Sequence, residues 1–266
     1  MNETPRTSST VSAKFLLPLT VLLAAIGTWQ LLIVLTNVSP IVVPTPASVA
    51  AASFRMVNEL SAATLRTAAA AGMGLAGSSV LGVLTAFGFA QSKLVRMALY
   101  PYAILLQTVP IIAVAPIVII SFGRGFHSVA LVALIISVFP VITSTTTGLL
   151  QVDANLLDLF RLHSATWWQL LFRLRMPSAL PYIISGVRIA SGTAVVGAIV
   201  GEFFVGSSQP GLGALIQQKS AGFLMDELYA TVICSAALGV AFFATITLGG
   251  ETLLNRRFGT SLEGRR

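Results

Sequence analysis

Long stretches without charge are the feature that most constrains this chain. Five of them contain no Lys, Arg, Asp or Glu: Phe15–Leu35, Thr67–Ser92, Met97–Gly123, Gly125–Val152 and Leu228–Gly250. A sixth, about Leu180–Phe204, is interrupted only by Arg188 and Glu202. A helix needs about 20 mostly apolar residues to cross the hydrocarbon core of a bilayer. The sequence therefore predicts an all-α, polytopic membrane protein with six transmembrane helices.

The composition excludes a water-soluble protein of this size. Only 9% of the residues are charged and 55% are hydrophobic, whereas a soluble domain carries about 25% charged residues. The first apolar stretch is longer than the core of a secretory signal and lacks a small-residue cleavage site, so it is predicted to be a retained helix. The expected organisation is a cytoplasmic tail at 1–14, a transmembrane domain at 15–254 and a cytoplasmic tail at 255–266.

The basic residues predict the orientation, because loops rich in Lys and Arg stay in the cytoplasm. With the N-terminus inside, twelve of the sixteen basic residues fall on the inner side, where Arg188 is counted because it is expected to snorkel inward. The other four, Arg55, Arg66, Arg124 and Lys219, fall outside. Both termini are thus predicted to be cytoplasmic, and the net charge of +7 reflects topology rather than nucleic-acid binding.

The longest inner segment, about 151–179, is predicted to form two short amphipathic helices with a break at Ser164-Ala165. Asp153 can cap the first helix and Thr166 the second, while Pro177 and Pro181 are expected to end the segment before the fifth transmembrane helix. Two interpretations stay open from the residues alone. The segment is either a hairpin at the membrane interface, with Trp167 and Trp168 in the aromatic belt, or a docking element for a partner.

Catalytic motifs are absent from the sequence. The stretch from Gly213 to Ser220 lacks the glycine that a phosphate-binding loop needs before its lysine. His127 and His163 are far apart and Cys234 is the single cysteine, so no metal site is expected. The chain is predicted to be a non-enzyme that holds no cofactor of its own.

The inner segment resembles the conserved cytoplasmic loop of ABC importer permeases, whose pattern is Glu-Ala-Ala, three residues, Gly, and then a terminal Leu-Pro. Asp158-Leu159-Phe160 takes the place of Glu-Ala-Ala, Ser164 that of Gly, and Ala179-Leu180-Pro181 that of the end. Further resemblance covers about 40–257 and includes Gln107-Thr108-Val109-Pro110 and Gly201-Glu202-Phe203-Phe204 followed by Gly211-Leu212-Gly213. The pattern is most similar to the nitrate/sulfonate/taurine-type branch, which includes permeases for thiamine-precursor pyrimidines and riboflavin.

The resemblance implies a type I importer permease in the bacterial inner membrane. Such a subunit moves a small solute from an external solute-binding protein to the cytoplasm by alternating access, and pairs with a second permease subunit, expected to be a homodimer. Two cytoplasmic ATPase subunits would bind the ATP and Mg. The residues implied to contact the ATPase are Asp158, Arg161, His163, Ser164, Ala165, Thr166, Trp167 and Trp168.

Polar side chains within the apolar stretches are candidates for a translocation path: Gln107, Thr108, Thr143, Ser191, Thr193 and Glu202. Hydrogen bonding between helices explains uncharged polar groups equally well. An ionisable residue inside a membrane span suggests function, but Glu202 is expected near the outer surface, where it can also be simply hydrated.

Two other classes compete with the importer. A secondary transporter or channel would act without an ATPase, but internal repeats, broken helices and paired ionisable residues are not evident in the sequence. A membrane-embedded enzyme would need a catalytic cluster. Because no Lys or Arg is expected in the middle of a span, the solute is predicted to be a thiamine-precursor pyrimidine or similar heterocycle, and otherwise nitrate, a sulfonate or taurine.

Overall fold

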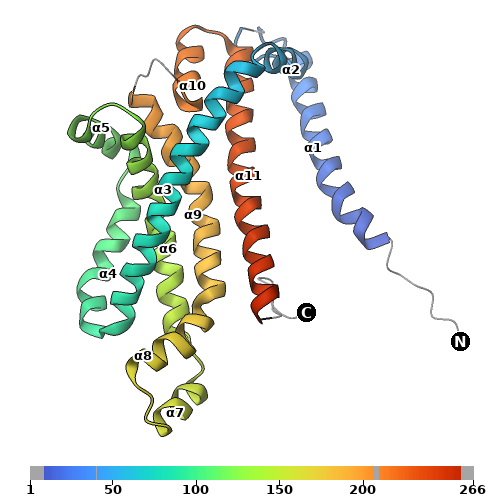
Figure 1. Ribbon diagram of the computed structural model, residues 1–266. Helices are drawn as coiled ribbons and strands as arrows, with labels where there is room; N and C mark the ends of the chain where they lie inside the picture. Colours follow the sequence, from blue (N-terminus) through green and yellow to red (C-terminus); the bar gives the residue numbers. More distant parts are fainter. Residues whose placement is uncertain (1–8, 40, 206–209, 259–266) are drawn as a thin grey trace, which may run out of the picture.

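The computed structural model describes residues 9–39, 41–205 and 210–258, and all regular secondary structure in these ranges is helical. Figure 1 shows a bundle of long helices, with α2 and α10 at one end and α7 and α8 at the other. In chain order the elements are α1 (Ser9–Thr36), α2 (Pro46–Arg55), α3 (Val57–Gln91), α4 (Lys93–Thr108), α5 (Ile111–Phe122), α6 (Phe126–Leu150), α7 (Ala154–Leu162), α8 (Trp167–Leu170), the π-helix η1 (Leu171–Arg175), α9 (Met176–Val205), α10 (Leu212–Ala221) and α11 (Met225–Phe258).

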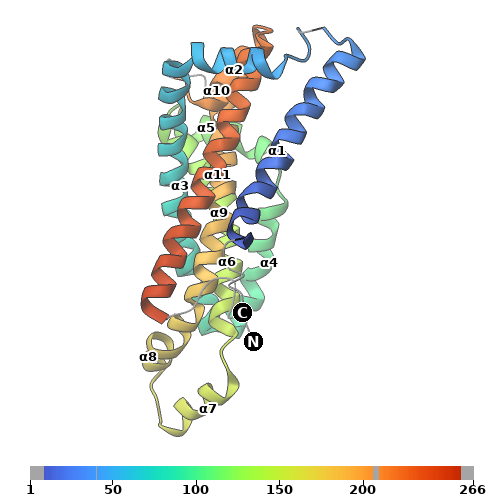
Figure 2. The same ribbon diagram turned by 90° about the vertical axis from the view of Figure 1, so that its right-hand side faces the viewer.

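Five helical segments are long and apolar enough to cross a membrane, which confirms a polytopic membrane protein. They lie in α1, α3, α6, the continuous helix from α8 to α9, and α11. Figures 1 and 2 show α1 leaning away from the bundle, and its apolar side chains from Leu16 onward are largely exposed. One contact joins it to the bundle near α2, where Trp29 stacks on Tyr229 of α11 with ring centroids 5.8 Å apart.

The third apolar stretch, Met97–Gly123, is not one helix, so the predicted count of six transmembrane helices is not fully confirmed. It is divided between α4 and α5, and α5 alone is too short for a full crossing. The break lies at Val109 and Pro110, both of which have extended backbones. Proline disfavours the helical conformation of the residue before it and lacks the N–H that would continue the helix. A broken helix is therefore present, contrary to the expectation from the sequence.

The centre of the bundle is formed by α3, α6 and α9, with α6 packed between the other two. Small residues allow this approach, as is common between helices in lipid. A Cβ atom on Gly74 of α3 would lie 2.6 Å from the Cβ of Ala133 in α6, and one on Gly197 of α9 would lie 2.8 Å from the Cα of the same alanine. The three backbones thus converge around Ala133.

Local side chains set the start of α2. Thr45 caps α2, with Pro46 at its first position, and accepts a hydrogen bond from the Ser48 amide. Pro177 and Pro181, by contrast, do not end the inner segment: both lie within α9, which continues α8 and η1 without a break. Of the two predicted tails, residues 1–8 and 259–266 lie outside the described residues, and 9–14 and 255–258 are helical.

Candidate functional site

The hairpin α7–α8 has well-defined ends. The side chain of Asp153 accepts a hydrogen bond from the Asn155 amide and caps α7. At the other end, the Ser164 amide donates to Arg161 O at 2.9 Å and the Ala165 amide donates to Phe160 O at 3.0 Å, the pair of bonds that defines a Schellman end. The first predicted helix and the break after it are confirmed, whereas the second is wrong as a separate short helix, because α8 continues through η1 into α9.

Ser164 occupies the position that usually requires glycine. Its φ is +50°, in the left-handed region that side chains other than Gly, Asn and Asp rarely adopt. This explains physically why the family pattern has Gly at the matching place. Directly after it, Thr166 and Gln169 form a reciprocal capping box that starts α8, as the sequence predicted for Thr166.

The hairpin exposes apolar surface away from the bundle. Leu162 is 82% exposed, Trp168 is 62% exposed and Leu159 is 49% exposed. A concave pocket of about 410 Å³ lies between the two helices and is lined in part by Phe160, His163, Ala165 and Gln169. Asp158 and Arg161 pair at 3.1 Å on the exposed face of α7. The residues implied to contact a partner thus lie on one compact hairpin.

The hairpin is joined to the bundle through η1. Helix geometry is continuous from Trp167 to Val205 over 39 residues, with a single π-type stretch at Leu171–Arg175. Arg175 donates from Nη1 to the carbonyl of Ala90 in α3 at 3.2 Å, and Leu171 packs against the inner end of the core. The hairpin is therefore attached to α9 by the continuous helix and to α3 by the hydrogen bond of Arg175.

Glu202 lies at the other end of α9 and is buried, 7% exposed, not hydrated at the surface. Its carboxylate accepts hydrogen bonds from Thr67 Oγ1 of α3 at 2.8 Å and from the amide of Gly213 at 2.7 Å. The amide of Leu212 in turn donates to Thr67 Oγ1 at 2.9 Å. The first amides of a helix have no partner within it, so Thr67 and Glu202 cap α10 from two other helices. We call this group the outer clamp, because it lies at the end of the bundle that holds α2 and α10, which the sequence predicts to be the outer end.

Two glycines make room for the outer clamp. A Cβ atom on Gly211 would collide with the carboxylate of Glu202, and one on Gly213 would collide with the carbonyl of Ile199. Gly211-Leu212-Gly213 and Glu202 were part of the family resemblance, so the sequence carried a signal for this contact. Thr67 was missed, because nothing in the surrounding sequence distinguishes it from other threonines of α3.

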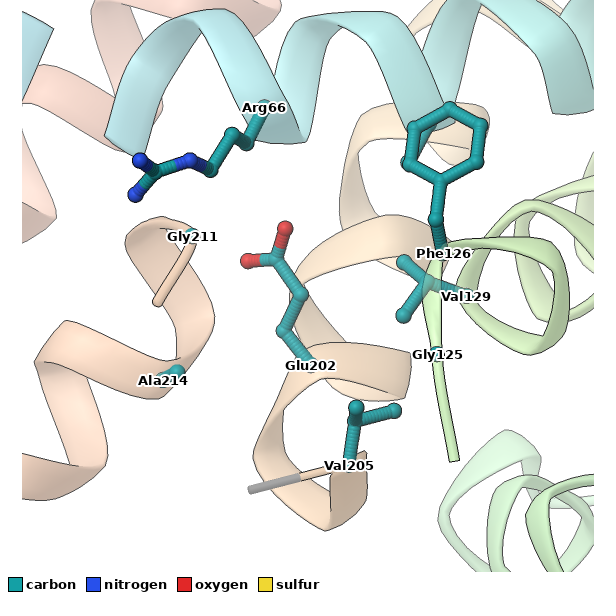
Figure 3. A pocket seen from close by; sticks show the side chains of 9 residues that line it. Arg66, Gly125, Phe126, Val129, Glu202, Val205, Gly211 and Ala214 are labelled. Carbon is teal, nitrogen blue, oxygen red and sulfur yellow. The ribbon is translucent and has the colours of Figure 1, made fainter. Parts of the chain in front are cut away.

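Beside the outer clamp lies a pocket of about 210 Å³ between α3, α6, α9 and α10. Figure 3 shows Arg66 and Glu202 pointing toward the same space, with Phe126 and Val129 on another side. Arg66 donates from Nη1 to the carbonyl of Pro210 at 3.1 Å. We call this space the outer pocket. It combines one acidic and one basic side chain with apolar walls.

The other residues predicted for a path do not join Glu202. Ser191 is fully buried and donates to Arg188 O, Thr193 donates to Ala190 O, and Thr143 donates to carbonyls of its own helix. Gln107 and Thr108 are exposed at the end of α4. Each of these four hydroxyls bonds to its own helix, so their place in a path stays a prediction. Arg188 lies with its guanidinium 5.4 Å from the ring centroid of Phe243 in α11.

A charged group ties the outer ends of four helices together. Lys219 of α10 donates to Glu227 at 2.9 Å and to Glu59 at 3.3 Å, and Arg55 pairs with Asp226 at 2.6 Å. Burial alone would lower the pKa of Lys219, but the hydrogen bonds and charges of the two glutamates outweigh it and raise the pKa above its ordinary value of 10.5. Lys219 is therefore charged at any physiological pH. Among the described residues, no cluster of His, Cys, Asp and Glu is arranged to bind a metal.

Comparison with known proteins identifies the family to which this chain is similar. Residues 78–260 match the family model of the binding-protein-dependent transport system inner membrane component. The chain is 36% identical over 180 residues to the formylaminopyrimidine transport permease protein ThiX of Halalkalibacterium halodurans, covering 68% of this chain and 71% of that protein.

Two further relatives extend the similarity over most of the chain. The riboflavin transport system permease protein RibX of Chloroflexus aurantiacus is 32% identical over 87% of this chain and 84% of its own. The putative aliphatic sulfonates transport permease protein SsuC of Bacillus subtilis is 30% identical over 90% and 86%. The chain therefore belongs to the binding-protein-dependent transport system inner membrane components, the permease subunits through which ABC importers move small solutes.

Proposed function

We propose that the α7–α8 hairpin is the element through which a cytoplasmic ATPase drives this permease. The observation that carries the proposal is a rigid, exposed, apolar hairpin that continues directly into a spanning helix. The helix from Trp167 to Val205 has 39 residues, or about 58 Å at about 1.5 Å per residue. A bilayer with its headgroups is about 40–45 Å thick. The hairpin consequently extends beyond the headgroups, which favours docking on a protein over a position at the membrane interface.

The proposed orientation places α7 and α8, with both termini, in the cytoplasm. The distribution of basic residues supports it, because twelve of sixteen lie on that side when Arg188 is included. Figures 1 and 2 agree with a common side, since the start of α1 and the end of α11 both point toward the α7–α8 end of the bundle. Arg55, Arg66, Arg124 and Lys219 then lie on the outer side.

The proposed assembly is a homodimer of this permease with two ATPase subunits and an external solute-binding protein. Each chain has one hairpin, and a twofold arrangement of identical subunits is the simplest closed assembly. ATP and Mg would bind to the ATPase subunits, because no phosphate-binding loop is present in this sequence. Family membership argues against the alternative of a secondary transporter or channel that works without an ATPase.

The proposed solute is a thiamine-precursor pyrimidine or a similar small heterocycle. A relative named for formylaminopyrimidine transport is 36% identical, and relatives named for riboflavin, sulfonates and nitrate are also similar. An anion would be expected to meet a free cation along its path. Arg66 lies at the α10 end of the bundle, and Arg188, the basic residue deepest in a span, has its guanidinium against Phe243. In the middle of the described spans there is thus no cation directed at a path, which favours a neutral solute over nitrate, a sulfonate or taurine.

An Ala165→Arg variant tests the role of the hairpin. Ala165 lines the pocket between α7 and α8, and a charged side chain there would have to be desolvated in a packed protein interface. We expect membrane insertion to be normal and solute uptake in proteoliposomes to fall at least about tenfold, equivalent to about 1.4 kcal/mol of coupling. ATP hydrolysis would no longer be coupled to uptake.

Asn155→Arg is the matched control, because Asn155 lies on the exposed start of the same hairpin and outside that pocket. It should retain uptake. Normal uptake by the Ala165→Arg variant would instead support a hairpin at the membrane interface. Co-purification of an ATPase with the unaltered chain, and its loss with Ala165→Arg, would separate the importer from a transporter that needs no ATPase.

A further inference from the structure

The outer pocket combines polar groups with apolar walls, as small-molecule sites do. It lies among the outer ends of four helices and measures about 210 Å³. Sites for drug-sized ligands have volumes of about 300–1,000 Å³. The outer pocket is therefore suited to a molecule with one ring and too small for a fused three-ring system such as a flavin.

Among the described residues, the polar groups of the outer pocket retain hydrogen-bonding capacity. A carboxylate has about four acceptor positions, and in this part of the chain Glu202 accepts from the hydroxyl of Thr67, which lies near both of its oxygens, and from the amide of Gly213. A guanidinium has five N–H donors, and Arg66 donates one of them to Pro210 O. Arg66 and Glu202 do not pair with each other within the described residues. A ligand with a donor and an acceptor side by side can bridge them.

The apolar walls of the outer pocket add a second requirement for its ligand, an apolar ring. Phe126, Val129 and Ala214 line the outer pocket, and Figure 3 shows Phe126 and Val129 on the opposite side of the Glu202 carboxylate from the guanidinium of Arg66. Aromatic rings prefer offset-stacked or edge-to-face neighbours. The carboxyl oxygens of Glu202 oppose an anion in the same space, since groups that carry negative charge density repel one another.

We propose that the outer pocket receives the transported solute on its way from the binding protein, and that it selects a single-ring heteroaromatic with an exocyclic amino group next to a ring nitrogen. The amino group donates to Glu202 and the ring nitrogen accepts from Arg66, while Phe126 and Val129 contact the ring. This proposal rests on the proposed function, because a solute reaches this position only in an importer fed from the outer side.

Saturation-transfer NMR on the permease–ATPase complex in lipid nanodiscs tests the site directly, with 4-aminopyrimidine as the probe. Pyrimidine lacks the amino group, taurine is zwitterionic with an anionic sulfonate, and riboflavin is too large. We expect the dissociation constant of 4-aminopyrimidine to be at least about tenfold lower than that of pyrimidine, the effect of one buried hydrogen bond. Equal binding of pyrimidine, or stronger binding of taurine or riboflavin, would overturn the proposal.

Variants locate the binding. Ala214→Phe fills the outer pocket and should abolish the probe signal, whereas Gln218→Phe adds the same ring to the exposed face of α10 and should retain it. Arg66→Gln should weaken binding about tenfold. Because Glu202→Gln also perturbs the outer clamp, Ala214→Phe and Arg66→Gln decide the matter: an unchanged dissociation constant in both contradicts the site.

The same samples separate this proposal from the proposed function. ATP hydrolysis stimulated by the solute-binding protein reports on coupling, and binding of 4-aminopyrimidine reports on the outer pocket. If the hairpin couples as proposed, Ala165→Arg loses the stimulation and keeps probe binding. Stimulated hydrolysis without any binding of the probe would refute the outer pocket and leave coupling intact. Probe binding with hydrolysis unaffected by Ala165→Arg would refute the coupling role and leave the site intact.

Discussion

Replacing Thr67 with valine should release the N-terminus of α10. The hydroxyl of Thr67 joins three helices, because it donates to Glu202 of α9 at 2.8 Å and accepts from the amide of Leu212 at 2.9 Å. Valine keeps the shape of threonine and removes both bonds. A buried group left without its hydrogen-bond partner costs about 1–3 kcal/mol. In the variant the Leu212 amide loses its acceptor, and the carboxylate of Glu202 loses one of its donors. Since Glu202 keeps its bond from Gly213, we expect a local loss of about 2–3 kcal/mol.

Amide hydrogen exchange at the start of α10 measures this loss where it occurs. A change of 2–3 kcal/mol corresponds to an increase in exchange rate of about 30- to 150-fold for amides that open locally. Peptides covering Leu212–Ala221 can be followed by mass spectrometry of the protein in nanodiscs. Thr67→Ser retains the hydroxyl and should lose no more than about 1 kcal/mol for the missing methyl group.

Thr85→Val is the matched control on the same helix. The hydroxyl of Thr85 donates to the carbonyl of Leu81 at 2.8 Å, within α3, so its removal should leave the exchange of α10 unchanged. The outer clamp would be refuted if Thr67→Val changed the exchange of α10 by less than about threefold, a difference below about 0.7 kcal/mol. An equal effect of Thr67→Ser would show that shape, and not hydrogen bonding, holds α10.

Three further substitutions test other parts of the structure. Ser164→Gly should stabilise the hairpin by about 1 kcal/mol, because glycine adopts a positive φ without strain; slower proteolysis or exchange there would agree, and no change would argue against a left-handed Ser164. Gly197→Val should destabilise the bundle by about 1–3 kcal/mol through overpacking, whereas Gly88→Val should not, because the space around Gly88 is open. Equal melting temperatures of the two variants would contradict the close approach of α9 to α6 at Gly197. Lys219→Met should lower the melting temperature equally from pH 6 to pH 9. The folded-state pKa of Lys219 is raised above 10.5, so the stability that its ion pairs contribute is present below that pH and is lost as the pH rises further. If the effect of Lys219→Met on the melting temperature already disappeared near pH 7, the ion pairs of Lys219 would be contradicted.

Local features of the fold were predictable because their causes are local. Apolar stretches predicted the long helices, and Asp153 and Thr166 predicted helix starts from side chains that reach only two or three residues along the chain. The broken third pass was also encoded locally, in the effect of Pro110 on Val109. It was missed because the stretch was judged by its charge alone.

The outer clamp could be predicted only in part. Glu202 and the two glycines around Leu212 are close in sequence, so their motif pointed to a shared role. Thr67 and Glu202 are 135 residues apart, and their contact depends on how α3 packs against α9. Burial of Glu202 follows from the same packing. Distance along an ideal helix placed this residue near the end of α9 that is far from the hairpin, as the structure shows, but it could not show that α10 folds over it.

The continuous helix from Trp167 to Val205 also determines how far a small rotation reaches. Glu202 follows Trp167 by 35 positions, which corresponds to about 52 Å of helix. If the helix tilts as one body about its inner end, each 10° of tilt displaces the outer end by about 9 Å on this length. Such a displacement exceeds the distance over which a hydrogen bond survives. A tilt of only a few degrees at the hairpin would thus be enough to break the hydrogen bonds that Thr67 and Gly213 donate to Glu202.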